Sequence, residues 1–120
     1  MKKEKERRES EILAEICEWL CAQEYFFWRT NNMPVFGRNN AGKMTFRSMP
    51  KFSLKGVPDI ILLYRGHFIG LEVKRPSGKL RPEQITFRER VIANGGNFFM
   101  VTSVEDTKKA LDDKTYIYAK

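Results

Sequence analysis

The stretch from Gly56 to Pro76, GVPDIILLYRGHFIGLEVKRP, constrains the fold more strongly than any other part of the chain. Two apolar segments rich in β-branched and aromatic residues, about Pro58–Tyr64 and Phe68–Lys74, flank the short sequence Arg65-Gly66-His67. Such a pattern is typical of two paired β-strands that are joined by a tight turn. The sequence therefore predicts a largely buried β-hairpin at the centre of the fold.

Three ionisable residues lie at the open end of this hairpin. If Arg65-Gly66 is a two-residue turn, Asp59 pairs with Glu72, although a turn of another length would change that register. Glu72 and Lys74 point to the same face because side chains alternate along a strand. Two carboxylates about 4 Å apart repel by about 4 kcal/mol at an effective dielectric near 20. Lys74 supplies one compensating charge, but a divalent cation suits two converging carboxylates better.

An ordinary salt bridge between Glu72 and Lys74 at a strand end is the alternative, and such pairs contribute little to stability. The surrounding sequence favours a functional site over a plain salt bridge. Pro58 has no N–H to offer the sheet, so Asp59 sits where regular strand pairing begins. A carboxylate in that position faces a groove while the rest of its strand stays buried.

The rest of the chain alternates between helical and extended patterns. Residues from about Glu6 to Ala22 carry apolar side chains at helical spacing, and Asn94-Gly95-Gly96 stops a second helix that runs to Ala93. Residues 31–55 are rich in Gly, Pro, Asn and basic side chains, which predicts a long functional loop with room for a short hairpin. The other elements expected are a short helix at Val104–Leu111 and strands at Tyr25–Thr30, Asn97–Thr102 and Thr115–Tyr118. This order predicts a single α/β domain over residues 1–120.

Basic residues are concentrated between Tyr25 and Pro58, a segment without any acidic residue. The whole chain has a formal net charge of +7 and a pI of about 9.6. A basic stretch of this length attracts polyanions, of which nucleic acid is the commonest, although a solubilising surface is the alternative. The positive charges of the segment are carried by Arg29, Arg38, Lys43, Arg47, Lys51 and Lys55.

Cys17 and Cys21 are four residues apart on the first predicted helix, where packing in the core is favoured over a disulfide. With His67 as the only histidine, the sequence lacks the ligands of a structural zinc site. No apolar run approaches the roughly 20 residues of a membrane span, and the charged N-terminus is not followed by an apolar signal segment. We therefore expect a soluble, intracellular protein.

Pro58-Asp59 on one strand and Glu72-Val73-Lys74 on the next resemble the PD-(D/E)XK motif of nucleases. More narrowly, the chain resembles the VRR-NUC (virus-type replication-repair nuclease) family. The short motif alone arises by chance, whereas a longer series of segments in family order is specific. That series covers nearly the whole chain: ESEI at 9–12, WRTN at 28–31, GVPDI at 56–60, LEVKRPSGKL at 71–80, PEQ at 82–84, and GG before an apolar strand at 95–101.

This resemblance implies a restriction-endonuclease-like α/β core, in which a central mixed sheet is flanked by helices in αβββαβ order with a C-terminal extension. It also implies that Asp59 and Glu72 bind a metal ion through their side chains, and Val73 through its main-chain carbonyl. A glutamate of the first helix completes the set, and the ESEI match places it at Glu11. Hard oxygen ligands favour Mg²⁺, with Mn²⁺ as a substitute, over zinc. Two other glutamates on the same helical face are alternatives to Glu11, namely Glu15 and Glu18.

The resemblance gives Lys74 the role of orienting or polarising the attacking water, or of stabilising the developing negative charge. Gln84 is expected to lean toward the same site and hold the water or a phosphate, and a plain polar contact at a helix start is the alternative. Arg29 and Asn31 match the strand-end pair of the family and are expected to meet phosphates, with an ordinary strand-terminal pair as the alternative.

Further phosphate contacts are expected from the basic residues that directly follow the catalytic strand, which are Arg75, Lys79 and Arg81. The aromatic residues are assigned differently. Trp28, Phe98 and Phe99 are most simply core residues rather than platforms for stacking bases.

The activity implied is that of a metal-dependent endonuclease that hydrolyses DNA phosphodiester bonds and recognises DNA structure more than sequence. Stand-alone members of the family resemble Holliday junction resolvases. We therefore expect junction resolution by a homodimer, whose two-fold symmetry suits two equivalent cuts. The resemblance also suggests a phage or mobile-element gene that acts in the cytoplasm of a bacterial host. The alternatives are a restriction-type endonuclease, a flap or single-strand nuclease, and a nucleic-acid-binding protein without catalysis.

Overall fold

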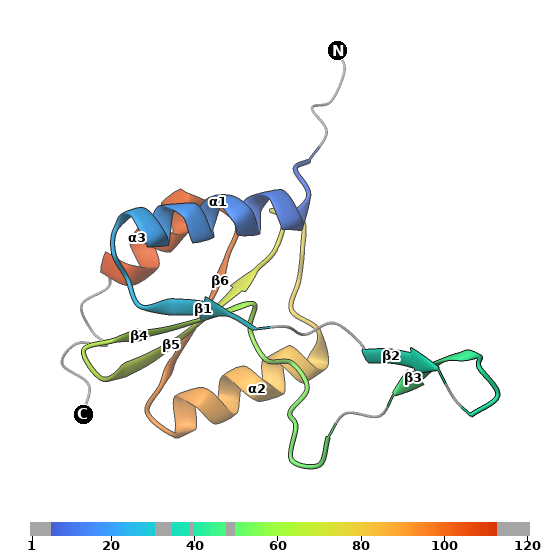
Figure 1. Cartoon of the computed structure of the whole chain (residues 1–120). Helices are drawn as coiled ribbons and strands as arrows, with labels where there is room; N and C mark the ends of the chain where they lie inside the picture. The colour runs from blue at the N-terminus through green and yellow to red at the C-terminus, as the bar shows by residue number, and fades with distance from the viewer. Residues whose placement is uncertain (1–5, 31–34, 39, 48–49, 113–120) are drawn as a thin grey trace.

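The computed structural model describes residues 6–30, 35–38, 40–47 and 50–112. Their helices and strands follow one another in the order that Figure 1 shows. The predicted strand at Thr115–Tyr118 and the N-terminal residues 1–5 lie outside this description. In chain order the elements are α1 (Glu9–Ala22), β1 (Phe27–Arg29), β2 (Val35–Arg38), β3 (Met44–Arg47), β4 (Ile60–Tyr64), β5 (His67–Val73), α2 (Pro82–Ala93), β6 (Asn97–Val101) and α3 (Val104–Asp112).

A mixed sheet forms the centre of the described fold. Its strands lie in the order β1-β4-β5-β6, with β1 and β5 both antiparallel to β4 and with β6 parallel to β5. Helix α2 makes the crossover from β5 to β6, as a parallel pair requires. Without β2 and β3 the order is αβββαβ followed by α3, which confirms the predicted fold class with its C-terminal extension. Strands β2 and β3 form a separate hairpin inside the basic segment 31–55, which also confirms the hairpin foreseen there.

The register of the central hairpin is the one that the two-residue turn predicts. Tyr64 pairs with His67, and five consecutive pairs lead back to Ile60 opposite Leu71. Arg65 and Gly66 both have positive φ, at 50° and 83°, as the turn type that matches the twist of paired strands demands. The next step beyond Ile60 and Leu71 places Asp59 opposite Glu72.

The hydrophobic core lies on one side of the sheet, between the strands and the layer formed by α1 and α3 (Figure 1). Along β4 and β5 every second side chain enters this core, because side chains alternate between the two faces. Helix α2 lies on the opposite side and packs against β6. The core residues are Ile12, Ile16, Leu20, Ile60, Leu62, Ile69, Leu71, Val73, Val101 and Leu111.

Two expectations about core residues are wrong. Cys17 is half-buried against the core as predicted, but Cys21 is exposed because it lies one residue past the buried position Leu20. Trp28 is 43% exposed on the edge strand, whereas Phe98 is buried as expected. None of the helices in the described ranges has both the length and the apolar character needed to cross a bilayer.

Gly56 is held where the loop before β4 touches the first turn of α2. Its φ is +78°, and a Cβ built there would lie 2.2 Å from the carbonyl oxygen of Glu83. We expect Gly56→Ala to lower the free energy of unfolding by about 3 kcal/mol, from the strain of a left-handed alanine and from the overlap with the α2 backbone. Urea unfolding measures this loss.

Gly95 provides the matched control, since its φ is +84° but nothing lies within 4 Å of the site of a Cβ. Gly95→Ala should therefore cost only the backbone strain, about 1 kcal/mol. Equal losses in Gly56→Ala and Gly95→Ala would show that the close approach to α2 is unimportant.

Candidate active site

The backbone that carries Asp59 is held from both sides. The N–H of Thr30, just after β1, donates to the carbonyl oxygen of Asp59 at 2.9 Å, and the Thr30 hydroxyl donates to the carbonyl oxygen of Pro58. Pro58 is fully buried, and a Cβ on Gly70 would lie 2.8 Å from its ring. Glycine at position 70 therefore leaves the space in which Pro58 packs, and the start of β4 is firmly placed.

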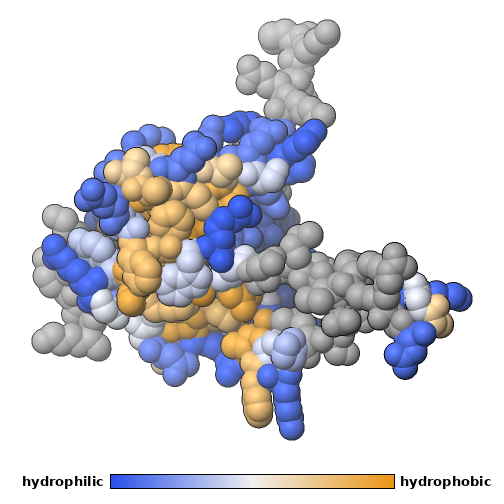
Figure 2. Space-filling model, viewed as in Figure 1, coloured by the Kyte–Doolittle hydropathy of each residue, from blue (hydrophilic) through white to orange (hydrophobic). Residues whose placement is uncertain are grey.

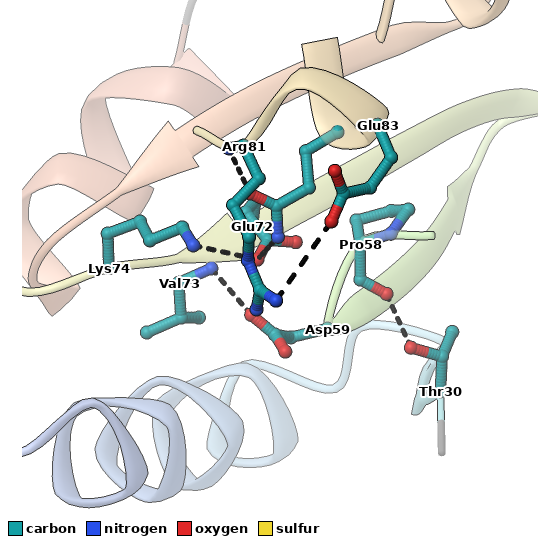
Figure 3. Close-up of polar contacts among 9 residues, drawn as sticks. Thr30, Pro58, Asp59, Glu72, Val73, Lys74, Arg81 and Glu83 are labelled. Carbon is teal, nitrogen blue, oxygen red and sulfur yellow. Dashed lines mark hydrogen bonds and ion pairs between the residues drawn. The ribbon is translucent and has the colours of Figure 1, made fainter. Parts of the chain in front are cut away.

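The Asp59 side chain turns toward the end of β5. Its Oδ2 atom accepts a hydrogen bond of 2.8 Å from the backbone N–H of Val73 (Figure 3). The N–H and C=O of one residue in an extended strand point to the same side. The Val73 carbonyl, which the sequence resemblance names as a ligand, therefore points toward the side of β5 where Asp59 lies.

Glu72 is buried, with only 4% of its surface exposed. Its Oε1 atom accepts a hydrogen bond of 2.7 Å from Nε2 of Gln84 and lies 3.8 Å from Nζ of Lys74, which is also buried. Its other oxygen, Oε2, is buried and has no hydrogen-bond partner among the residues that the structure describes. A buried carboxylate oxygen without a hydrogen-bond partner lowers the stability of the fold. We therefore expect a proton or a cation to bind at Glu72 Oε2.

Gln84 connects the acidic pair to α2. It is buried in the first turn of the helix, where its Oε1 atom accepts a hydrogen bond of 2.8 Å from the backbone N–H of Arg81 while Nε2 donates to Glu72. One end of the Gln84 amide makes the polar contact at the helix start and the other holds the Glu72 carboxylate, while the holding of a water or a phosphate stays a prediction. In this arrangement Gln84 positions Glu72.

The carboxyl groups of the pair have strongly altered affinities for protons. Burial raises the pKa of Glu72 to about 8, with the charge of Asp59 adding to the rise and Lys74 opposing it. Burial also raises the pKa of Asp59, although the hydrogen bond from Val73 and the charge of Lys74 lower it. The charge of Asp59 favours the protonated form of Glu72, whereas Glu72 lowers the pKa of Asp59, so the pair retains its proton on Glu72 near neutral pH unless a cation replaces it.

Among the first-helix glutamates, Glu9 is the one whose charge acts on this pair, and the metal-ligand role expected for Glu11 stays a prediction. After burial, the negative charge of Glu9 also raises the pKa of both Asp59 and Glu72. Glu9 precedes the buried Ile12 by three residues and is in phase with the sheet-facing stripe of α1. Glu11 lies about 200° around the helix from Glu9.

The glutamates predicted from the sequence occupy the outer side of α1. Glu11 pairs with Arg7 and Arg8 at 3.8 and 4.0 Å. Glu15 receives two hydrogen bonds of 2.6 Å from Arg7. Glu18 is exposed. The electrostatic partners of Glu11 and Glu15 are thus arginines of their own segment, and not the site carboxylates.

The donor set fits a hard divalent cation. Asp59 and Glu72 come from neighbouring strands, the orphaned Glu72 oxygen lacks a partner, and oxygen ligands of this kind suit Mg²⁺ or Mn²⁺. Within the ranges that the structure describes, no group of three or more His, Cys, Asp or Glu side chains is already gathered around one point. Two carboxylates and a main-chain carbonyl are therefore the cation ligands that the described residues offer.

Most of the residues predicted to contact DNA are exposed. Arg81, at the start of α2, lies beside the acidic pair in Figure 3 and reaches Glu83 at 4.0 Å. Arg38 and Arg47 lie on the paired strands β2 and β3, and their side chains are not described. Asn31 lies outside the described residues. The other predicted contacts are exposed side chains, namely Arg29, Lys43, Lys51, Lys55, Arg75 and Lys79.

Sequence reasoning missed two residues that shape the site. Thr30 was part of the WRTN match but received no role, although it clamps the peptide between Pro58 and Asp59. Glu9 was part of the ESEI match but was passed over in favour of Glu11. Helical phase relative to Ile12 and Ile16 is the signal that identifies Glu9.

An α/β fold of the restriction-endonuclease-like type is thus combined with an Asp on one hairpin strand and a Glu-x-Lys on the next. Among solved structures, a chain described as "VRR_NUC domain" superposes on this one with a TM-score of 0.60, covering 88% of this chain and 95% of its own length. The sequences are 21% identical, so the comparison establishes that the two chains share the VRR-NUC fold. No protein-family model and no curated protein matches the sequence.

Proposed function

We propose that this chain is a metal-dependent, structure-selective DNA endonuclease. The observation that carries the proposal is the buried oxygen of Glu72 that has no partner among the described residues, with the charge of Asp59 acting on Glu72 and the ammonium of Lys74 3.8 Å from its other oxygen. Perturbed carboxyl groups of this kind gather at functional sites. The shared VRR-NUC fold adds support, because the name of that domain refers to a nuclease.

The chain's own residues divide the work of phosphodiester hydrolysis. Asp59, Glu72 and the Val73 carbonyl would hold Mg²⁺ or Mn²⁺, and Glu9 is the first-helix glutamate that we add in place of Glu11. When bound, the ion supplies charge stabilisation at the phosphoryl oxygens and activation of the attacking water. Lys74 brings a buried positive charge to the same point, where it orients that water or stabilises the developing negative charge.

Positioning residues keep these groups in place. Gln84 fixes the rotamer of Glu72, and Thr30 fixes the backbone of Asp59. The exposed basic side chains around the site, among them Arg81, would bind the phosphates on either side of the cut without reading sequence. We further propose that the enzyme works as a homodimer on four-way junctions in a bacterial cytoplasm, since a two-fold assembly presents two equivalent sites to two equivalent strands.

The test is a cleavage assay on labelled linear duplex, 5′ flap, single strand and four-way junction. Each substrate is incubated with Mg²⁺, Mn²⁺ or EDTA, and with the variants Asp59→Ala and Lys74→Ala. We expect cutting with either metal, none in EDTA, and a loss of about a thousand-fold or more in both variants. Cutting that persists in EDTA or in both variants would remove the metal mechanism.

The same assay separates the rival activities. Sharp cleavage of linear duplex at one sequence indicates a restriction-type enzyme, and preference for flap or single strand indicates a nuclease of branched or open ends. Binding without cutting, unchanged by Asp59→Ala, indicates a DNA-binding protein without catalysis. Equal cutting of all the substrates would remove only the preference for junctions.

A further inference from the structure

The edge strand beside the acidic site presents an exposed aromatic pair. Phe26 is 65% exposed and Trp28 is 43% exposed, and their ring centroids lie 5.5 Å apart. Leu63, which is hydrogen-bonded through its backbone to Phe26, is also exposed. Figure 2 shows apolar surface on this side of the molecule, between the two helical layers. We call Phe26 and Trp28 the apolar shelf, and Leu63 lies beside it; clustered large apolar side chains at a surface mark an interaction site.

Strand geometry places the shelf on the same face of the sheet as Glu72. Phe27 packs against the core on the α1 side, so Phe26 and Trp28 project from the opposite face. Trp28 pairs with Ile61, which follows Asp59 by two residues. Two residues along a strand span about 7 Å, so Trp28 lies about one row of side chains away from the row of Asp59 and Glu72.

Helix α2 covers only half of this face. Its Phe87 packs against Phe98 of β6, with ring centroids 6.5 Å apart, and its Gln84 reaches Glu72 of β5. The half formed by β1 and β4 keeps its aromatic side chains exposed. The acidic pair therefore lies between α2 on one side and the apolar shelf on the other.

We propose that Phe26 and Trp28 stack unpaired bases of the DNA strand whose phosphate enters the acidic site. This inference deepens the proposed nuclease function and rests on it. Aromatic side chains that bind successive bases, next to cations that follow the backbone, are the usual means of holding single-stranded nucleic acid. Exposed cations are present beside the site at Arg81 and on the loop before β4 at Lys51 and Lys55.

The substrate class follows from the energetics of stacking. A base inside a duplex is already stacked on its neighbours, whereas an unpaired base gains about 1–3 kcal/mol from an aromatic side chain. The shelf therefore favours DNA with unpaired nucleotides next to the cut, which at a four-way junction means an opened branch point, over continuous duplex. Because every base has a π-face, this selection is independent of sequence.

The experiment measures DNA binding in EDTA, where the strand stays intact, by fluorescence anisotropy. Labelled single strand, gapped duplex and continuous duplex are titrated with wild type, Phe26→Ala, Trp28→Ala and Trp28→Phe. We expect each alanine variant to weaken binding of single strand and gapped DNA about tenfold, with less than about a twofold effect on continuous duplex. Trp28→Phe retains a stacking ring and should bind nearly as wild type does. Leu63→Ala is the matched control, since it removes an equally exposed apolar side chain of the same face without removing a ring.

Several outcomes would overturn the stacking proposal. One is that the alanine variants bind continuous duplex as weakly as they bind single strand, or that they bind all the DNA as wild type does. Another is that Leu63→Ala loses as much affinity as Trp28→Ala. A third is that the alanine variant loses affinity because its melting curve shows it to be unfolded, while the folded Trp28→Phe binds no better than that variant. A dimer that becomes monomeric in Trp28→Ala with unchanged DNA binding would assign the shelf to self-association. Parallel cleavage assays in Mg²⁺ keep the two proposals apart. Cutting with no role for Phe26 and Trp28 defeats only the stacking, and ring-dependent binding without cutting defeats only the nuclease.

Discussion

Replacing Asp59 with Asn should abolish cleavage and at the same time stabilise the metal-free protein. Asparagine keeps an oxygen that accepts the hydrogen bond from Val73, but it removes the charge that opposes ionisation of Glu72. The full repulsion between the two carboxylates is about 4 kcal/mol at 4 Å and an effective dielectric near 20, and retention of a proton already relieves part of it. We therefore expect the free energy of unfolding in EDTA at about pH 8 to rise by about 1–2 kcal/mol.

The two halves of this prediction are measured separately. Urea unfolding in EDTA reports stability, and a Mg²⁺ titration followed by melting temperature reports whether the cation still binds. The wild type should gain stability from Mg²⁺, whereas Asp59→Asn should gain little and should cut at least about a thousand-fold more slowly. This opposite movement of stability and activity is a property of functional sites that a structural ion pair lacks.

Glu105→Gln is the control for loss of one negative charge, because Glu105 is an exposed residue of α3 with only a surface ion pair to Lys108 at 3.4 Å. Its stability should change by less than about 0.5 kcal/mol, and its cleavage should be unaffected. A metal-free Asp59→Asn protein that is less stable than wild type would mean that the carboxylate of Asp59 is held by favourable contacts, and the repulsion argument would fail.

The central hairpin could be predicted in full because its register depends on local chemistry. Arg65-Gly66 accepts the positive φ values of a two-residue turn, and from that turn the pairing of Asp59 with Glu72 follows by counting. Lys74 then joins them by alternation along the strand. The acidic pair is thus predictable without any knowledge of the remaining fold.

The third glutamate shows where a motif is insufficient. ESEI contains both Glu9 and Glu11, and letters alone do not say which one faces the sheet. Helical phase distinguishes the two glutamates, because Ile12, Ile16 and Leu20 define the buried stripe of α1 and Glu9 continues that stripe toward the N-terminus. This phase can be read from the sequence pattern, and the choice between Glu9 and Glu11 as a metal ligand stays a prediction.

The exposure of Trp28 could not be predicted in the same way. Whether an aromatic residue on a strand is covered depends on which strand lies at the edge and on how far the opposite helix extends. β1 is the edge strand and α2 packs over β5 and β6, so Trp28 stays exposed although its sequence neighbours are apolar. These are tertiary facts, and local propensity carries no information about them.

Stability in EDTA should fall as pH rises, and Mg²⁺ should reverse this trend. Burial and then the charge of Asp59 together raise the pKa of Glu72 from an ordinary value of 4.5 to about 8 in the folded protein. Between these two values the folded state binds more protons than the unfolded state. The contribution to stability is therefore complete below about pH 4.5 and is lost as pH rises through about 8. Burial raises the pKa of Asp59 in the same direction, so its contribution has the same sign.

The expected measurement is a series of urea unfolding curves across this pH range, with EDTA or with Mg²⁺. One extra proton on the folded state gives a slope of at most about 1.4 kcal/mol per pH unit, downward with increasing pH. Mg²⁺ requires the ionised carboxylates, so the stability that it adds should grow as pH rises and should be largest at and above about pH 8.

Glu72→Gln separates this effect from general titration of the chain. The variant can still accept the hydrogen bond from Gln84, but it has no proton to lose, so its curve in EDTA should be nearly flat over the range in which the wild type falls. Its response to Mg²⁺ should also disappear, whereas Glu105→Gln should keep both the slope and the response. A wild-type stability that is constant or rising between about pH 4.5 and about pH 8 in EDTA would contradict the raised pKa of Glu72. The buried carboxyl would then be satisfied by the protein itself, and the reason for expecting a cation beside it would be lost.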